Sequence, residues 1–229
     1  MSETIEKRSK QNYSEIALYY LREQIINGQL QPGEKLIENN ISDKLNISRG
    51  PVRDALKQLA VEGLVDYQPN KGCTVALLSP KDAYEVFFLR GSLEKLALEK
   101  SGCHVDTYGL LAMEAALDEL RSLEGADDLL AESRADEKFH AQIVRSCQIS
   151  RLYKMWELLS PLNGAMFLLL KKMGEDSGST YAESRSIRLT NSHERIYEAI
   201  RSENLTEACR ALDDHYLKKG EQLYRHSLS

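Results

Sequence analysis

The chain has 229 residues, a net charge of −5, 42% hydrophobic residues and 28% charged residues. This composition is typical of a globular protein that buries a core, and the length suffices for two ordinary domains. The acidic balance argues against indiscriminate nucleic-acid binding. The first dozen residues lack the apolar centre of a signal peptide, and the longest apolar run, Met166–Leu170, is too short to span a bilayer. We therefore expect a cytoplasmic protein with no membrane segment.

The four cysteines lie far apart in the chain and form no C-x-x-C pair. They are Cys73, Cys103, Cys147 and Cys209. The sequence therefore indicates neither a disulfide scaffold nor a thiolate zinc site, and buried free thiols are the simpler interpretation.

The N-terminal part begins with two predicted helices. Apolar residues recur at helical spacing over Tyr13–Ile26, and Asn27-Gly28 ends this pattern. Pro32-Gly33 marks a turn, after which Ile41 and Leu45 indicate a short second helix.

A third predicted helix follows and carries cations on one face. Ser48 is a good N-cap residue, Pro51 suits the first turn, and Gly63 ends the run. Two sets of side chains recur on different faces: apolar Val52, Ala55 and Leu59, and cationic Arg49, Arg53 and Lys57. One face of the helix therefore packs against the core while the other is cationic. The short connection between the second and third predicted helices has the length found in a helix-turn-helix.

A β-hairpin is predicted directly after the cationic helix. Leu64–Tyr67 has the pattern of a strand, Pro69–Gly72 that of a turn, and Cys73–Leu77 that of a returning strand. A helix-turn-helix followed by such a wing predicts a winged domain that ends near Leu78. Acidic and basic residues are equal in number up to that point, so attraction to phosphate must come from local patches.

The remainder of the chain is predicted to be helical, beginning at the Ser79-Pro80 cap. Helical periodicity runs over Tyr84–Lys100, Tyr108–Leu123, Leu129–Cys147, Leu152–Met173, Ser184–Ile200 and Thr206–Tyr224. We predict a mainly α fold, with a winged helix-turn-helix domain at residues 1–78 and an all-helical six-helix bundle at residues 79–229. Pro161 is expected to kink the fourth of these helices. The apolar run Gly164–Leu170 indicates burial in the bundle or a dimer interface.

Four polar residues fall on core-facing positions of three predicted helices. Asp136 and His140 are four residues apart and share a face with Ile143, while His193 and His215 lie on apolar stripes of two later helices. Unpaired buried polar groups are costly, and one carboxylate with three imidazoles suits a divalent Zn, Ni or Mn ion. For each histidine alone, a hydrogen-bonded core residue is the alternative interpretation.

Several spaced motifs occur in the first third of the chain: P-G-E-K-L from Pro32, I-S-R-G-P-V-R-D-A-L from Ile47, L-A-V-E-G-L-V from Leu59, and the wing at Gly72. This part resembles the winged helix-turn-helix domain of the GntR family of bacterial transcription regulators. The resemblance implies a homodimer that binds a double-stranded, inverted-repeat operator through the third helix and the wing. The expected DNA-binding residues are Lys44, Ser48, Arg49, Pro51, Arg53, Lys57, Lys71 and Gly72.

The rest of the chain resembles the ligand-binding FCD domain of the FadR subfamily. The matching motifs are F-L-R-G-S-L-E around Arg90, D-E-K-F-H at Asp136, H-E-R-I-Y-E-A-I at His193 and A-L-D-D-H at His215. The resemblance implies that the metal ligands are Asp136, His140, His193 and His215. It also implies that Arg90 can hold the carboxylate of a small organic or sugar acid effector, although an i,i+4 ion pair with Glu94 is the alternative. Arg185 and Arg188 fit a cavity lining or a charged surface equally well.

Together these patterns predict a one-component transcription regulator that is not an enzyme and, by resemblance, is a metabolite-responsive repressor. A metal-dependent hydrolase with a zinc-bound water is the alternative, because three histidines and one aspartate could leave a coordination position open. No further Glu or His is obviously placed as its general base. A metal that only holds the bundle together is a second alternative.

Overall fold

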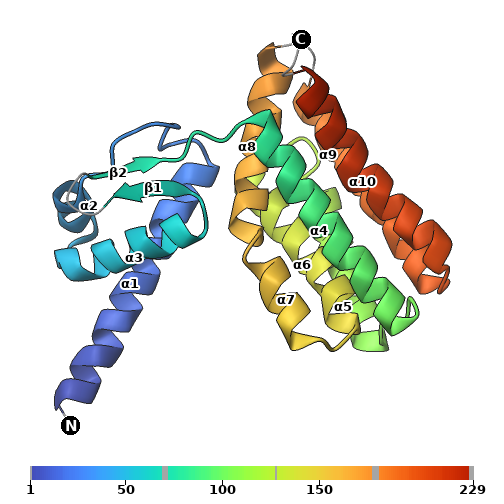
Figure 1. Cartoon of the computed structure of the whole chain (residues 1–229), viewed down its shortest axis with the longest axis horizontal. Helices are drawn as coiled ribbons and strands as arrows, with labels where there is room; N and C mark the ends of the chain where they lie inside the picture. The colour runs from blue at the N-terminus through green and yellow to red at the C-terminus, as the bar shows by residue number, and fades with distance from the viewer. Residues whose placement is uncertain (1, 69–71, 127, 177–180, 227–229) are drawn as a thin grey trace. The chain divides into compact units, whose positions relative to one another are not determined.

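The computed structural model describes residues 2–68, 72–126, 128–176 and 181–226, and it divides into two compact units, residues 1–77 and 78–229 (Figure 1). Side chains are described over residues 13–68, 72–126, 128–171 and 189–216. Within the described residues, no helix is both long and apolar enough to cross a membrane. Lys71, Arg185 and Arg188 have side chains outside these ranges, so the expectations for them stay untested.

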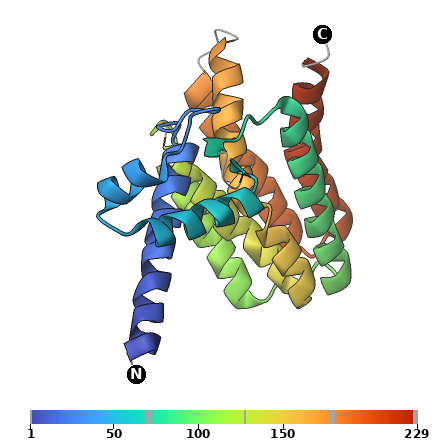
Figure 2. The same ribbon diagram turned by 60° about the vertical axis from the view of Figure 1, so that its left-hand side comes forward.

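The N-terminal unit contains α1 (Ser2–Ile26), α2 (Glu38–Leu45), α3 (Arg49–Val61), β1 (Val65–Gln68) and β2 (Gly72–Val75). Figures 1 and 2 show α1 packed against α3, with the N-terminal half of α1 extending beyond the rest of the unit. The helix therefore begins eleven residues before the predicted start. Apolar periodicity marks only the packed part of a helix, and residues 2–12 contain no Gly or Pro to stop it earlier.

The helix-turn-helix and the wing have the predicted order. Apolar side chains from all five elements of this unit form its core, among them Leu21, Ile41, Val52, Leu56, Leu59, Val65 and Val75. The wing is an antiparallel pair in which Val65 lies opposite Val75 and Gln68 opposite Gly72. Ser48 does occupy the N-cap position of α3, but its side chain makes no capping hydrogen bond, so the expected bond is absent. The second strand ends at Val75 rather than Leu77.

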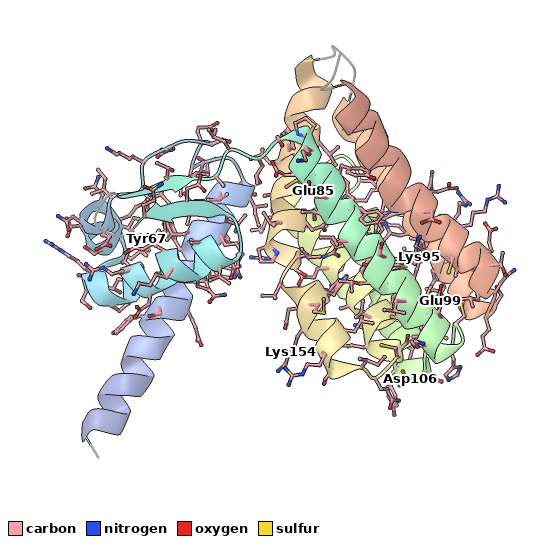
Figure 3. All side chains as sticks on the ribbon, viewed as in Figure 1. Tyr67, Glu85, Lys95, Glu99, Asp106 and Lys154 are labelled. Atoms are coloured by element: carbon pink, nitrogen blue, oxygen red, sulfur yellow. The ribbon has the colours of Figure 1, made fainter. Side chains whose placement is uncertain are left out.

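All the regular elements described in the C-terminal unit are helices. Its elements are α4 (Pro80–Ser101), α5 (Thr107–Ser122), α6 (Leu129–Ser146), α7 (Ser150–Glu157), α8 (Ser160–Asp176), α9 (Tyr181–Arg201) and α10 (Leu205–His226). The Ser79 side chain accepts a hydrogen bond from the Asp82 amide and the Asp82 carboxylate accepts one from the Ser79 amide, so a capping box begins α4. The first and last helices of this unit, α4 and α10, lie side by side (Figures 1 and 3). Lys95 of α4 forms an ion pair with Asp213 of α10.

The sequence predicted one helix over Leu152–Met173 with a kink at Pro161. The structure instead has two separate helices, α7 and α8, in this region, so the prediction was wrong. Pro161 is the second residue of α8, where a missing backbone N–H breaks no helical hydrogen bond. The chain therefore turns before Pro161 and begins a new helix there. This break brings Ser160 and Asn163 to buried positions beside α4 and α6, and Gly164–Phe167 is buried as the apolar run indicated.

The four cysteines are free thiols. Cys73 and Cys103 are buried, while Cys147 and Cys209 are only half-buried. Burial raises the pKa of Cys73 and of Cys103 to about 11, so both remain protonated at neutral pH.

Candidate metal centre and nucleic-acid interface

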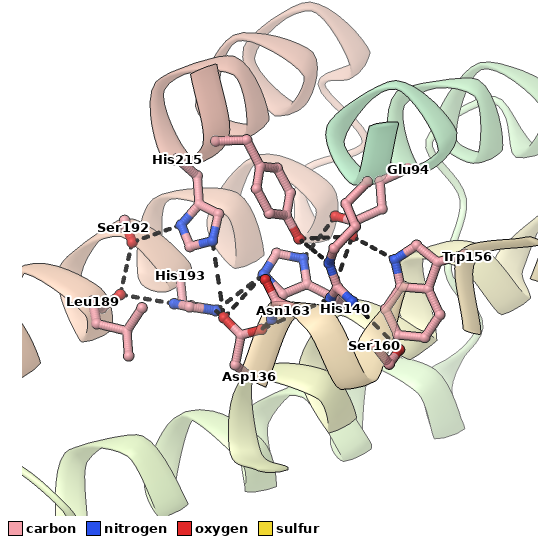
Figure 4. A network of polar contacts seen from close by, with 12 residues as sticks. Glu94, Asp136, His140, Trp156, Ser160, Asn163, Leu189, Ser192, His193 and His215 are labelled. Carbon is pink, nitrogen blue, oxygen red and sulfur yellow. Dashed lines mark hydrogen bonds and ion pairs between the residues drawn. The ribbon is translucent and has the colours of Figure 1, made fainter. Parts of the chain in front are cut away.

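Four side chains from three helices meet inside the C-terminal unit. Asp136 and His140 project from α6, His193 from α9 and His215 from α10 (Figure 4). All four are buried, with exposed fractions of 0% to 5%. One ligand atom from each lies within 4.8 Å of the ligand atoms of the other three. The structure thus brings together the four residues singled out in the sequence.

One oxygen of Asp136 lies at the centre of this group. Its Oδ1 atom is 3.2 Å from Nε2 of His193, 3.7 Å from Nε2 of His140 and 4.0 Å from Nε2 of His215. The Nε2 atoms of His140 and His193 are 3.1 Å apart. The three histidines therefore direct the same ring nitrogen towards one point.

The other ring nitrogen of each histidine contacts an acceptor. Nδ1 of His140 lies 2.7 Å from a carboxylate oxygen of Glu94, and Nδ1 of His193 lies 2.7 Å from the carbonyl oxygen of Leu189. Nδ1 of His215 is 2.9 Å from Oγ of Ser192, whose hydroxyl proton is donated to the same Leu189 carbonyl. Carboxylates and carbonyls only accept hydrogen bonds, so Nδ1 carries the proton in each ring.

This tautomer leaves a lone pair on each Nε2 atom. Two lone pairs that face one another at 3.1 Å, as in His140 and His193, repel unless a cation lies between or beside them. A divalent metal satisfies three imidazole nitrogens and one carboxylate oxygen together, and histidine ligands held by a hydrogen bond at the opposite nitrogen are usual in metal sites. The residues present therefore fit a divalent metal.

The charge state of the group agrees with this fit. Burial favours the neutral form of Asp136, but its electrostatic interactions with His140, His193 and Arg90 outweigh burial and hold the pKa of Asp136 well below its usual range. Burial lowers the pKa of His193, which keeps this ring neutral. A carboxylate that stays ionised beside a neutral imidazole is the state in which both can donate electron pairs to a metal.

The cationic face predicted on α3 is present. Arg49, Arg53 and Lys57 are exposed one helical turn apart, and Lys44 is exposed on α2, where its ammonium lies 5.4 Å from the ring centre of Tyr20. Within the described residues, Arg49 and Lys57 have no hydrogen bond or ion pair. Arg53 differs, because Nε and Nη2 donate to the two carboxylate oxygens of Glu38 at 3.1 and 2.8 Å.

The remaining expected DNA-binding residues differ in exposure. Ser48 is exposed before α3, and Gly72 is exposed at the start of β2 with a φ of +124°, which favours glycine. Pro51 is buried, so it shapes the first turn of α3 rather than offering a surface to DNA. Lys71 lies outside the described residues.

The sequence matches two family models that together span both units. Residues 12–75 match the model described as bacterial regulatory proteins, gntR family, and residues 85–218, more than half of the chain, match the FCD domain. This chain belongs to the GntR family. It is a transcriptional regulator with an FCD domain, as the motifs predicted, and the family consists of regulators rather than enzymes.

Known GntR regulators align over most of this chain. The HTH-type transcriptional regulator LutR of Bacillus subtilis is 31% identical over 83% of this chain and 92% of its own length. The gluconate operon transcriptional repressor of the same species is 29% identical over 81% of this chain and 74% of its own. The solved structure of Escherichia coli McbR/YncC covers 94% of this chain and 98% of its own with a TM-score of 0.75, and at 19% identity it supports the fold alone.

Within the FCD domain, Glu94 is a residue whose position the sequence pattern did not reveal. It is fully buried and accepts hydrogen bonds from Nε1 of Trp156 at 2.8 Å, Oη of Tyr216 at 2.8 Å and Nδ1 of His140 at 2.7 Å. These partners come from α7, α10 and α6. The carboxylate therefore orients a metal-facing histidine while satisfying two aromatic donors. The sequence feature that could have indicated this role is that Glu94 lies one helical turn after Arg90 on the same face of the helix.

Arg90 of the FCD domain lies inside the unit, and the i,i+4 ion pair with Glu94 considered for it is present but buried. Its side chain is fully buried over the ring of Trp156, Nε donates to Tyr216 and Nη1 to Ser160 at 3.3 and 3.4 Å. Nη2 has no hydrogen-bond partner among the described residues, and it lies 3.9 Å from Glu94 Oε1. Burial opposes the charge, but Tyr216 and the two carboxylates raise the pKa, so the guanidinium stays charged.

The second oxygen of Asp136 connects the metal-facing group to Arg90. Oδ2 accepts a hydrogen bond from Nδ2 of Asn163 at 2.9 Å and lies 3.8 Å from Nη2 of Arg90. Ser160 and Asn163, which reach this place through the break before α8, were not among the predicted site residues. An asparagine in an otherwise apolar run was the signal that could have found one of them.

Proposed function

We propose that this chain is a metabolite-responsive transcriptional repressor whose operator affinity is set by a small acid bound in the FCD domain. Residues 1–78 bind a double-stranded, inverted-repeat operator. Residues 79–229 hold a divalent metal and the effector and form a homodimer. The names of relatives support repression, since one is a gluconate operon transcriptional repressor.

The convergence of Asp136, His140, His193 and His215 carries the proposal. These four residues would hold the metal through three Nε2 atoms and one carboxylate oxygen, and Zn, Ni and Mn all accept such ligands. The metal would supply positive charge and open coordination positions for an anionic ligand. Four protein ligands fill a tetrahedral zinc site, whereas an octahedral ion keeps two positions for the effector.

Arg90 is suited to bind the effector carboxylate. Its Nη2 atom is a buried donor with no hydrogen-bond partner among the described residues, and it lies 3.8 Å from the metal-facing aspartate. Leaving such a donor unpaired is costly, so an added acceptor at this place gains more than the same contact at the surface. Ser160 and Asn163 supply hydroxyl and amide groups nearby, which suits a hydroxylated organic or sugar acid.

Arg90 and the metal-facing residues are buried, so binding of the effector beside them requires helices of this unit to separate. This movement would couple effector binding to operator affinity. An effector shifts operator affinity only if it binds one arrangement of the dimer better than another. The metal-holding helices are the elements whose arrangement it would bias.

The experiment combines elemental analysis with DNA binding. Protein purified without chelator is expected to contain one equivalent of Zn, Ni or Mn and to bind its own upstream DNA more tightly than a scrambled duplex. Gluconate and related sugar and hydroxy acids are then titrated into the complex, and at least one should release the DNA. Absence of metal together with unchanged melting after EDTA would overturn the metal centre. Metal without any effector response would leave the metal a structural role.

A further inference from the structure

The pair formed by Glu38 and Arg53 separates one cation of the α3 face from the others. Glu38 is the first residue of α2 and Arg53 lies in the middle of α3, so the contact joins the two helices of the helix-turn-helix. Two parallel hydrogen bonds of 3.1 and 2.8 Å join the Nε edge of the guanidinium to both carboxylate oxygens. Arg49 and Lys57, one turn on either side, have no such partner among the described residues.

The pairing determines which donors of Arg53 remain available. A guanidinium has five N–H groups, and the contact with Glu38 uses one on Nε and one on Nη2. The two N–H groups at the tip, one on each Nη, remain parallel and unused by Glu38. This is the edge that fits the O6 and N7 atoms of guanine.

Glu38 also changes the electrostatic behaviour of Arg53. The pair is neutral, so Arg53 adds less to the release of counterions from DNA than Arg49 and Lys57, which have no ion pair within the described part of the chain. The hydrogen bonds from Arg53 and the nearby charges of Arg49 and Lys57 lower the pKa of Glu38, which keeps the carboxylate ionised. If Arg53 turned to grip a phosphate with its whole fork, Glu38 would lose its partner and face the negative backbone. Such a contact is disfavoured on every duplex.

We propose that Glu38 is a specificity-determining residue, which holds Arg53 by its Nε edge so that the tip reads a base and which disfavours contacts of Arg53 with phosphate. Arg53 is thereby pre-organised, since a held side chain loses less conformational freedom when it binds. The inference rests on the proposed binding of an operator by residues 1–78. A purely structural role, in which the pair only fastens α2 to α3, predicts weaker binding to all DNA alike.

The test measures binding of the full-length, metal-containing protein to two duplexes by fluorescence anisotropy. One duplex is its own upstream DNA and the other is a scrambled duplex of the same composition, each over a series of salt concentrations. Glu38→Ala and the isosteric Glu38→Gln are compared with Asp54→Ala, which removes an exposed carboxylate of α3 and changes the charge equally. Circular dichroism melting verifies that each variant is folded.

We expect both Glu38 variants to lower the ratio of specific to non-specific affinity by about tenfold, with binding to the scrambled duplex unchanged or tighter. The salt dependence on scrambled DNA should become steeper by about one charge. Asp54→Ala should keep the ratio, and Glu38→Ala should change it no further once Arg53 is alanine. An unchanged ratio in the Glu38 variants, or an equal loss on both duplexes, overturns the inference while the operator preference of the wild type upholds the proposed function. A wild type without any preference overturns both.

Discussion

A carboxylate holds a nitrogen donor in each unit of this molecule, but the surroundings of the two pairs are opposite. Glu38 and Arg53 lie at the surface, with side chains 25% and 50% exposed, whereas Glu94 and His140 are fully buried. Water can replace either partner in the first pair, so the free-energy difference between paired and separated states is small. Nothing can replace a partner in the second pair, because both groups would remain desolvated.

This difference matches the two proposed roles. A residue that contacts DNA must exchange its surroundings whenever the protein binds or leaves, and an exposed pair permits that exchange at little cost. A metal ligand must keep one tautomer and one orientation whether or not the metal is present. The buried hydrogen bond from His140 to Glu94 provides such permanence.

The largest effect is expected from removing a metal-facing ring. His193→Ala should lose the metal and the effector response and should melt at a lower temperature, because one ion would otherwise join α6, α9 and α10. His104→Ala is the matched control, since this histidine is exposed on the same unit. Metal content by elemental analysis and melting temperature are the measurements. Full metal occupancy in His193→Ala would contradict the assigned ligand set.

A smaller effect is expected from changing the acceptor behind a ligand. In Glu94→Gln the amide must face either His140 or the donors of Trp156 and Tyr216, so one hydrogen bond is lost or His140 changes tautomer. Metal affinity should fall by about 10- to 100-fold in competition with a chelator. Glu99→Gln, exposed on α4, is the control. Nitrogen NMR of the metal-free protein should show the His140 tautomer population changing, and an unaltered spectrum with unaltered affinity would remove the orienting role.

Substitution of Arg53 tests the role of the exposed pair formed by Glu38 and Arg53. Arg53→Ala should weaken binding to the operator by roughly 5- to 150-fold if the tip reads a guanine, with a smaller change on scrambled DNA. Arg49→Ala, which removes a cation without an ion pair among the described residues, should instead weaken binding to both duplexes similarly and reduce the salt dependence. Anisotropy titrations at several salt concentrations distinguish the two patterns. Identical behaviour of both variants would show that pairing with Glu38 makes no difference.

The most gradual effect concerns pH and the metal-free protein. Burial lowers the pKa of His193 from 6.5, so below pH 6.5 the unfolded chain binds more protons than the folded chain. The free energy of unfolding therefore decreases as the pH is lowered below 6.5. The pKa of Asp136 is lowered from 3.8, so its contribution is present above about that pH and is lost only in stronger acid. Calorimetry of stripped protein from about pH 8 to about pH 5 should show a falling melting temperature. A melting temperature that does not change over this interval would contradict the burial of a neutral His193.

Local patterns predicted the elements of this fold well where each element is limited by its own residues. The Ser79-Pro80 start of α4 and the order of helix, turn, helix and wing follow from caps, turns and side-chain periodicity within a few residues of chain. The start of α1 and the break before α8 were predicted wrongly. Both depend on which stretch of the chain packs against the rest of the unit. Apolar periodicity does not mark the end of a helix that packs against nothing, and it does not show whether a proline kinks a helix or begins a new one.

The sequence by itself determined the residue types of the metal-facing group, because an aspartate and three histidines on apolar stripes are unusual in any helix. It did not determine their partners. Glu94 and Asn163 lie 46 and 27 residues from the ligands they touch, and the charge and hydrogen bonding of Arg90 depend on helices that are distant in the chain. Which polar groups share one buried space is set by the packing of α4, α6, α8 and α10, and the cost of desolvating each group makes that arrangement decisive.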